Sequence, residues 1–354
     1  MTAPETEKRG LADGSRRAII VWLALVAFLV FAMVVLGGVT RLTESGLSMT
    51  EWRPVTGWLP PISETAWQAV FDKYRASPEY QKINAGMSLE DFKTIFWFEY
   101  AHRLLGRIIG LAFFLPFLGF LFAGRLDRPM TLRLFCLLGL GALQGLMGWL
   151  MVKSGLVDRP SVSQYRLALH LFLAFVIYGA LVWTILELRR APDYGPGETG
   201  LGTRRRIAGG LLALISLTVV SGAFVAGLDA GRYYNTFPLM GDALVPPDYG
   251  SAMPWWQNSF ENIAAVQFHH RVIAILSVLA ALGTWLTTRG SHLTRHTRHA
   301  AAALAAMAVL QACLGIATLL AYVPVWLGAL HQAGALVLFT LSIMLLASFR
   351  QRHA

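Results

Sequence analysis

Residues 96–122 have the sequence FWFEYAHRLLGRIIGLAFFLPFLGFLF, in which an apolar run follows a carboxylate, a histidine and two arginines. The run is long enough to cross a bilayer as a helix. Ionisable groups are costly near a hydrocarbon core, and where they occur they usually mark functional positions. The segment therefore predicts a membrane-spanning helix with a polar site near one end.

The rest of the chain has the composition of a membrane protein. Of 354 residues, 55% are hydrophobic and 14% are charged, and the mean hydropathy is +0.53. These values exclude an ordinary soluble globular domain. Runs of about 20 apolar residues, each enough for one spanning helix, occur at 18–40, 97–123, 132–152, 166–188, 206–228, 264–286, 300–321 and 328–348. The first run is too long for a signal peptide, so we expect it to be retained. The fold class is predicted as an all-α integral membrane protein with eight transmembrane helices.

The basic residues alternate along the chain and do not form one patch. They lie before the first run and after the second, fourth, sixth and eighth: Lys8, Arg9, Arg16, Arg17, Arg125, Arg128, Arg133, Arg189, Arg190, Arg204, Arg205, Arg206, Arg289, Arg295, Arg298, Arg350 and Arg352. By the positive-inside rule these segments are cytoplasmic, as are both termini. The net charge of +10 therefore does not indicate that the protein binds nucleic acid. We expect a multi-pass protein of the inner (plasma) membrane, in contact with lipid.

The sequence repeats itself. EYAHRLLGRIIGLAFF (99–114) aligns with AVQFHHRVIAILSVLAAL (265–282), LQGLMG (143–148) with LQACLG (310–315), and LALHLFLAF (167–175) with GALHQAGAL (328–336). VVLGGVTRL (34–42) resembles VVSGAFVAGL (219–228). The chain thus contains two copies of a four-span unit. Since four is even, both copies have the same orientation, and we predict two tandem four-helix bundles related by a pseudo-two-fold axis along the membrane normal.

The repeat also predicts the domain limits. The N-terminal unit is 18–190 and the C-terminal unit is 206–349. A cytoplasmic linker, 191–205, joins them, and cytoplasmic tails are predicted at 1–17 and 350–354.

Each unit has two aligned histidines near the outer ends of its second and fourth spans. They are His102 and His170 in the first unit, and His270 and His331 in the second. A lone histidine in a membrane helix is often only a packing residue. Two superposable pairs favour a heme iron held between facing helices in each unit, near the outer face. His269 has no histidine counterpart, so a packing or polar role is expected for it.

The residues beside these histidines differ between the units. Glu99 precedes His102 by three positions, on the same helical face, whereas Gln267 holds that place in the second unit. A bis-histidine heme has no open coordination position, so the second unit suits electron transfer or structure. The carboxylate makes the first unit the better candidate for chemistry, although Glu99 is also placed to form an ion pair with Arg103. Arg103 and its counterpart Arg271 could pair with heme propionates or extend to the membrane interface. The sequence does not decide between these two roles.

Other features of the sequence say less about the function. Cys136 and Cys313 lie inside predicted spans, so no disulfide framework is expected in the outer loops. The tract RGSHLTRHTRH (289–299) has histidines spaced as in a metal site, but a solvated cytoplasmic loop is favoured. TAWQAVFDKYRAS (65–77) is an amphipathic segment that fits a cap at the outer interface, and Trp255 and Trp256 fit an aromatic belt.

The motif GGVTRLTESGLSMTEWRP (37–54), the segment FEYAHRLLGR (98–107) and the four histidines together resemble the heme A synthase family. The resemblance covers all eight spans and both units. It implies a membrane oxidoreductase that oxidises the C8 methyl of heme O to a formyl group by successive hydroxylation. The product, heme A, would serve terminal oxidase assembly.

The resemblance also implies roles for residues of this chain. His102 and His170 would flank the iron of the substrate heme, with Arg103 beside it. His270 and His331 would ligate the iron of a heme b cofactor, with Arg271 beside it. Glu99 would be the catalytic carboxylate.

Some family members have a cysteine pair in the first outer loop. No cysteine occurs between 41 and 95, so the electron route is not given by such a pair here. The prenyltransferase that makes heme O, heme O synthase, is the expected partner, and the sequence leaves homo-oligomers open.

Two other functions fit parts of this pattern. A diheme b-type cytochrome that only transfers electrons would use the same four histidines. A secondary transporter built from repeats would use Glu99 to couple protons, but it would have helix breaks near mid-membrane. The ionisable residues here gather near one face, so the transporter ranks third.

Overall fold

The computed structural model describes residues 13–53, 56–157, 161–189 and 200–350. These residues are mostly helical and include no β-strand. The predicted tails 1–17 and 350–354 and the linker 191–205 lie wholly or largely outside the described ranges. The limits 18–190 and 206–349 therefore stay predictions.

Within the described ranges, eight helices are long and apolar enough to cross a membrane. They are α1 (Asp13–Leu42), α4 (Leu89–Phe122), α5 (Arg128–Val157), α6 (Gln164–Leu188), α7 (Leu201–Gly227), α8 (Ile263–Arg289), α9 (Arg295–Leu320) and α10 (Val325–Ser348). Each contains one predicted apolar run or nearly all of it, so the predicted fold class is confirmed.

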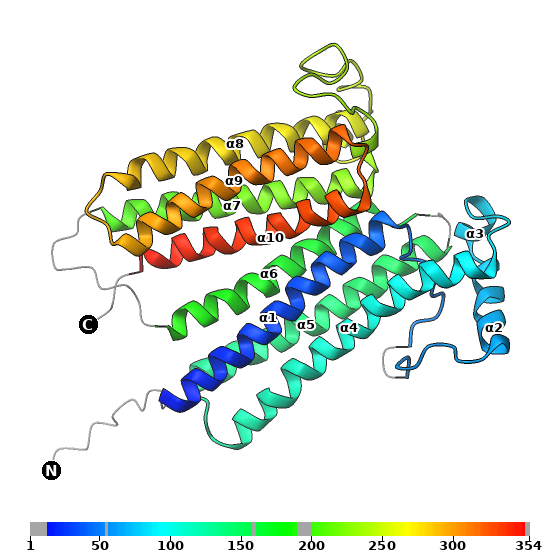
Figure 1. Ribbon diagram of the computed structural model, residues 1–354, viewed down its shortest axis with the longest axis horizontal. Coiled ribbons are helices and arrows are strands. Elements are labelled where there is room, and N and C mark those ends of the chain that lie inside the picture. The colour runs from blue at the N-terminus through cyan, green and yellow to red at the C-terminus, as the bar shows by residue number, and fades with distance from the viewer. Residues whose placement is uncertain (1–12, 54–55, 158–160, 190–199, 351–354) are drawn as a thin grey trace.

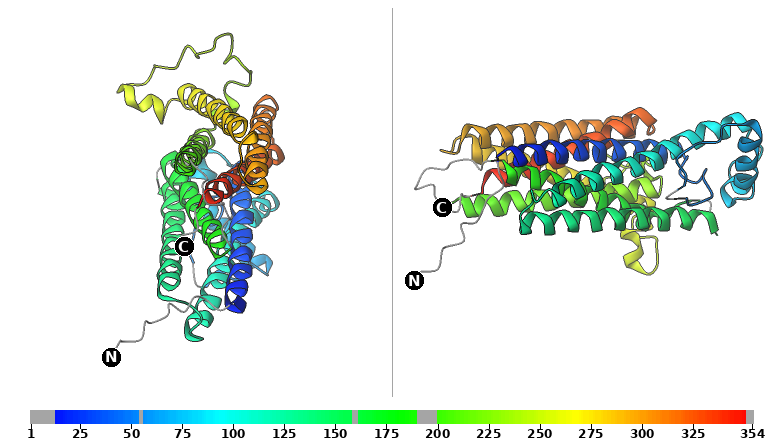
Figure 2. Two further views of the ribbon diagram at one scale, coloured as in Figure 1. Left: turned by 90° about the vertical axis from the view of Figure 1, so that its left-hand side faces the viewer. Right: turned by 90° about the horizontal axis from the view of Figure 1, so that it is seen from below.

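The eight long helices form two groups, which Figures 1 and 2 show from three directions. One group contains α1, α4, α5 and α6, and the other contains α7 to α10. In each group successive helices are in contact, and the first helix also contacts the last. The groups meet through α1, α6, α7 and α10. This arrangement agrees with two tandem four-helix units.

The contact between the two groups is reciprocal. A Cβ added at Gly328 of α10 would lie 2.6 Å from Leu42 Cδ1 of α1. A Cβ added at Gly227 of α7 would lie 3.5 Å from Leu167 Cδ2 of α6. In the repeat, position 42 corresponds to 227 and position 167 to 328. The two contacts therefore join equivalent positions of the repeat, but the leucine comes from the first helix of the unit in one contact and from the fourth helix in the other. Two such equivalent contacts are expected when the units are related by a two-fold axis.

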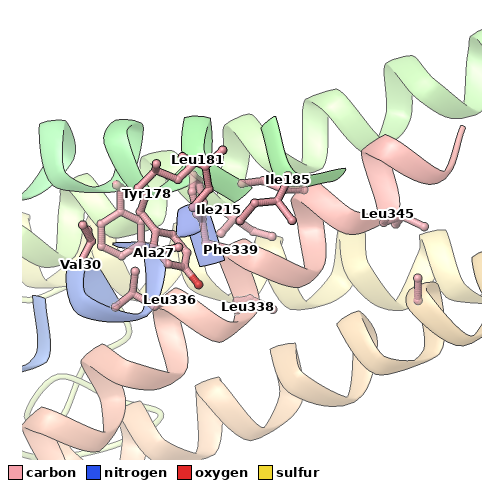
Figure 3. Packing of buried hydrophobic residues seen from close by; sticks show 14 of the residues in the cluster. Ala27, Val30, Tyr178, Leu181, Ile185, Ile215, Leu336, Leu338, Phe339 and Leu345 are labelled. Carbon is pink, nitrogen blue, oxygen red and sulfur yellow. The ribbon is translucent and has the colours of Figure 1, made fainter. Parts of the chain in front are cut away.

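The buried core lies where the groups meet. Figure 3 shows Ala27 of α1, Leu181 of α6, Ile215 of α7 and Leu336 of α10 in one apolar cluster. The hydroxyls of Tyr178 and Thr340, from α6 and α10, lie 2.8 Å apart and hydrogen-bond across the boundary. Because lipid is as apolar as these side chains, close packing and such polar contacts hold membrane helices together. The shared core fixes the two units relative to each other.

The loop between α1 and α4 lies on the side of the molecule that is predicted to be the outer side, and it carries two further helices, α2 (Glu64–Arg75) and α3 (Pro78–Lys82). This loop is called the first outer loop. The predicted amphipathic segment forms α2, and its buried Trp67, Phe71 and Tyr74 pack against α4. Helix α4 begins at Leu89, eight residues before the predicted run, because Ser88 caps it and aromatic residues bury its first turns. Figure 1 shows α2 and α3 at the outer end of the first group. The second outer loop contains two short 3₁₀ helices, η1 (Ala230–Arg232) and η2 (Trp255–Ser259).

Candidate functional site

Each of the four predicted histidines lies against a glycine of a neighbouring helix. The pairs are His102 with Gly37 of α1, His170 with Gly148 of α5, His270 with Gly222 of α7, and His331 with Gly315 of α9. A Cβ added at these glycines would lie between 2.9 Å (Gly315) and 3.4 Å (Gly37) from the imidazole. The missing side chains leave room for the rings between the helices.

The helices that carry the predicted histidines are arranged alike in the two groups. His102 of α4 lies within electrostatic range of His170 of α6, and His270 of α8 within range of His331 of α10. That each pair holds one iron stays a prediction. Each pair joins the second and fourth long helix of its group. Two imidazoles from facing helices form the arrangement that holds a heme iron in a helical bundle.

A glutamine accompanies one histidine of each pair. Gln144 Nε2 donates to the carbonyl oxygen of His170 at 3.2 Å and lies 3.3 Å from its Nε2 atom. Gln311 Nε2 donates to the carbonyl oxygen of His331 at 2.7 Å and lies 3.1 Å from its Nδ1 atom. These glutamines stand at the same place in the aligned LQGLMG and LQACLG segments. They hold equivalent positions around equivalent histidines.

Glu99 and Arg103 fasten the first outer loop to α4. Glu99, only 2% exposed, accepts hydrogen bonds from Ser48 Oγ at 2.8 Å and from the backbone N–H of Met49 at 2.7 Å. Arg103 forms an ion pair with Glu99 at 2.5 Å and donates to the carbonyl oxygens of Met49 and Glu51. The loop segment after α1 is thereby held against α4 at Glu99 and Arg103, the positions on either side of Tyr100 to His102.

Gln267 and Arg271 fasten the second outer loop to α8 from the aligned positions, although Gln267 donates hydrogen bonds to the loop whereas Glu99 accepts them. Gln267 Nε2 donates to the carbonyl oxygen of Ala230 at 2.9 Å and to that of Tyr234 at 3.2 Å. Arg271 donates to the carbonyl oxygens of Tyr234 and Leu239. The two units therefore share a loop anchor, but only the first contains a carboxylate. Contact of Arg103 or Arg271 with a propionate stays a prediction.

The chain matches the family model described as "Cytochrome oxidase assembly protein" over residues 20–343. It is 51% identical to the heme A synthase of Nitrosospira multiformis, over 93% of this chain and 92% of that protein. The heme A synthases of Parvibaculum lavamentivorans and Paramagnetospirillum magneticum are 50% and 48% identical. Those matches cover 94% and 97% of this chain, and 94% and 96% of the relatives. The chain belongs to the heme A synthase family. The resemblance drawn from its motifs is confirmed.

The residues around both histidine pairs fit the heme group that the heme A synthase family implies. Among the described residues, buried Gln144 Oε1, Gln311 Oε1 and His170 Nδ1 have no hydrogen-bond partner. An iron-bound imidazole uses one ring nitrogen, and the N–H of the other needs an acceptor. In each glutamine the Nε2 atom faces the histidine ring, and exchanging the amide nitrogen and oxygen would place an acceptor there. The glycines opposite the rings let the imidazoles lie between the helices.

The two pairs of this family member differ in how firmly one histidine is oriented. Ser221 Oγ donates to the carbonyl oxygen of Thr218 at 2.8 Å and lies 2.9 Å from His270 Nδ1. The hydroxyl oxygen can then accept a hydrogen bond from the Nδ1–H group of His270. The other ring nitrogen, Nε2, is left available to a metal. The aligned position in the first unit is Leu36, which offers His102 no such acceptor. In the second unit, His270 thus has a hydrogen-bond partner that the aligned position of the first unit does not provide.

The remaining sequence expectations concern residues away from these pairs. His269 Nε2 lies 2.8 Å from the Tyr249 hydroxyl and packs against its ring, which agrees with the predicted polar contact. Trp255 and Trp256 are exposed on η2. The histidines of 289–299 belong to no group of three or more His, Cys, Asp or Glu side chains that could hold a metal ion within the described part of the chain. The thiols of Cys136 and Cys313 are free.

Proposed function

We propose that this chain oxidises the C8 methyl of heme O to a formyl group by successive hydroxylation, giving heme A for terminal oxidase assembly. Membership of the heme A synthase family supports this activity. The observation that carries the division of labour is the inequality of two otherwise equivalent histidine pairs. One has a carboxylate and a histidine opposite Leu36 in the alignment, and the other has an amide and a histidine in contact with Ser221.

In this proposal the second unit holds the resident cofactor. His270 and His331 ligate heme b, which supplies one-electron transfer when it is bound. Ser221 orients His270, and Gln311 orients His331. Rigid ligands favour a cofactor that stays bound, because little ordering is left to occur when the metal is taken up.

The first unit holds the substrate. His102 and His170 flank heme O, and the absence of a fixed acceptor for His102 suits a group that must enter and leave. Glu99 is proposed as the catalytic carboxylate. Its position three residues before His102 lets it accept a proton or stabilise positive charge as the methyl is oxidised. Gln267, its counterpart, can do neither.

The proposal places the protein in the plasma membrane with both termini in the cytoplasm and both histidine pairs toward the outer face. The distribution of basic residues supports this orientation. Heme O synthase is proposed as the partner that supplies the substrate, because a very apolar molecule would then avoid water. A homo-oligomer is compatible with the proposal, but the proposed reaction does not depend on one.

Optical spectra and extracted hemes of purified protein test this function. The full chain is expressed in cells that make heme O, as wild type and as His331→Ala, Glu99→Gln and His269→Ala. We expect heme b with heme O or heme A in wild type and loss of heme b in His331→Ala. Glu99→Gln should keep heme O and form at least tenfold less heme A. His269→Ala is the matched control, because this histidine adjoins His270 and is predicted not to bind iron.

The same spectra separate the enzyme from a diheme electron carrier. A carrier would purify with two equivalent hemes b, and Glu99→Gln would leave the heme types unchanged. The two results together would exclude the proposed reaction, whereas unchanged heme types in Glu99→Gln alone would exclude only the proposed role of Glu99. Glu99→Gln places at this position the amide found in the second unit, where the side chain donates to loop carbonyls and does not accept from loop donors. Retained heme O in this variant shows that the first unit still binds its substrate.

A further inference from the structure

A cavity of about 240 Å³ lies between α4, α5 and the loop segment after α1, in the unit that contains the first histidine pair. Its walls come from the outer ends of α4 and α5 and from the loop segment after α1, and they include Trp52, Arg103, Trp149 and Lys153. Arg103 directly follows His102. Trp149 directly follows Gly148, the glycine that His170 faces. The cavity therefore adjoins the neighbours of both histidines.

Two cations line this cavity, each over an aromatic ring. Arg103 Cζ lies 5.2 Å from the centroid of Trp52, and Lys153 Nζ lies 5.1 Å from that of Trp149. Arg103 is paired with Glu99. Lys153, in contrast, has an aromatic contact but no carboxylate partner in the parts of the chain that the structure describes. A cation held beside a cavity without a counter-ion favours an anionic ligand.

The one carboxylate that lines the cavity does not cancel this charge. Glu51 forms ion pairs with Lys73 and Arg53. The hydrogen bond from Lys73 holds the pKa of Glu51 below its usual range, so this group stays ionised and committed to its two partners. The surroundings of the cavity therefore keep an excess of positive charge.

The second unit lacks these features. The offset of 167 that aligns LQGLMG with LQACLG places Leu320 opposite Lys153 and Ile316 opposite Trp149. A cation and an indole are thus replaced by two aliphatic side chains. The difference separates the unit proposed to hold substrate from the unit proposed to hold a permanent cofactor.

We propose that Lys153, with Arg103, forms a carboxylate-binding subsite for the propionates of the substrate macrocycle. This inference rests on the proposed function. The C8 methyl shares its pyrrole ring with one propionate, so a fixed propionate also fixes that methyl. Charge-assisted hydrogen bonds from Lys153 would give the substrate one orientation between His102 and His170, and binding in that orientation precedes any chemistry.

Binding of a porphyrin acid and its ester tests the subsite without turnover. Full-length protein in neutral-lipid nanodiscs is titrated with ferric protoporphyrin IX and with its dimethyl ester, followed by absorbance and by quenching of tryptophan fluorescence. We expect wild type to bind the free acid roughly tenfold more tightly than the ester. Lys153→Leu, which installs the residue type of the second unit, should remove this preference and leave ester binding unchanged. Lys93→Leu, an outer cation paired with Glu90, is the control and should keep it.

Three results would overturn the inference. In one, Lys153→Leu keeps the preference for the free acid. In another, it weakens acid and ester equally, which indicates a packing role. In the third, phosphatidylglycerol in the nanodiscs abolishes the preference in wild type, which shows that an anionic lipid headgroup fills the site. If wild type still forms heme A, only the subsite fails. If it forms none and binds neither porphyrin, the proposed function fails with it.

Discussion

Glu79 is a buried carboxylate of the first outer loop, separate from both histidine pairs. It is 5% exposed, and the Tyr74 hydroxyl donates to it at 3.0 Å while Asn84 donates to that hydroxyl at 2.8 Å. Burial raises the pKa of Glu79 from 4.5 to about 7. The hydrogen bond from Tyr74 opposes this rise, and the charges of Glu99 and Glu44 add to it. The folded loop therefore favours the protonated form.

The raised pKa of Glu79 predicts an outer loop that weakens as the pH rises. Between about pH 4.5 and pH 7 the unfolded loop has lost a proton that the folded loop keeps, so local stability falls by roughly 3 kcal/mol across this window. Glu79→Gln should remove the dependence. Hydrogen exchange of residues 74–84, corrected for intrinsic rates, measures it below and above the window. Glu90→Gln, an exposed carboxylate, serves as control, and a pH dependence that survives in Glu79→Gln contradicts the prediction.

Single residues differ in how far the sequence reveals them. The four histidines could be predicted because each is rare and has an aligned partner. The glycines opposite them are also aligned in the repeat, Gly37 with Gly222 and Gly148 with Gly315, but the sequence does not tell which of the 33 glycines face a histidine. Gln144 and Gln311 had a usable signal in the aligned LQ pairs. Their hydrogen bonds to histidine backbone became visible only when helices were packed.

Helices α1 and α10 are joined by a polar contact that lies next to both histidine pairs. Gln332 Nε2 donates to the carbonyl oxygen of Val34 at 2.7 Å. A Cβ at Gly38 would lie only 2.0 Å from Gln332 Oε1. Gln332 follows His331, and Gly38 follows the glycine that faces His102. The register of α10 on α1 therefore sets the position of one pair relative to the other.

This contact predicts coupled effects of Gly38→Ala and Gln332→Leu. Leucine is the residue at the aligned position 171. Each single change should destabilise the protein by about 0.6 kcal/mol, the usual size of a polar contact between membrane helices. The double variant should cost no more than the larger single effect, because both changes remove the same contact. Thermal unfolding of the purified variants measures this cycle. Gly110→Ala, where a Cβ meets nothing within 4 Å, is the control, and strictly additive losses would contradict the coupling.

Helix limits show why hydropathy finds elements but not their ends. The run predicted at 97–123 marks the apolar part of α4, yet the helix begins at Leu89. Residues 89–96 include three charged side chains, so they do not resemble a membrane span. Their helical structure depends on the Ser88 cap and on aromatic packing with α2. Both are contacts outside the hydrocarbon region.

The arrangement of the whole molecule follows from the repeat only in part. Internal similarity predicts two like units with one orientation. It does not tell which helices meet, because the aligned segments are equally apolar on several faces. The contact through α1, α6, α7 and α10 depends on complementary pairs such as Leu42 and Gly328. The sequence of one helix does not show that its leucine will pack against a glycine of another helix.

Two ion pairs also join the units at their outer ends. Arg41 of the first unit lies 2.8 Å from Asp229 of the second, and Arg232 of the second lies 3.5 Å from Glu44 of the first. Glu44 and Asp229 correspond in the repeat, and both have left-handed backbone, with φ of 53° and 51°. Each unit thus presents one carboxylate, at the same turn, to an arginine of the other.

These reciprocal pairs predict a salt-sensitive contact between the units. Glu44→Gln with Asp229→Asn removes both charges and keeps a side chain that tolerates the turn at 229. The pairs are partly exposed, so we expect a loss of roughly 1 kcal/mol for the two together. Spin labels on the outer ends of α1 and α7 should report a broader distance distribution. High salt should broaden it in wild type, whereas the double variant should respond little. Glu64→Gln with Asp242→Asn removes two loop carboxylates elsewhere and should leave the distribution unchanged. If wild type shows no response to salt while the variant broadens, lost packing rather than lost charge separates the units.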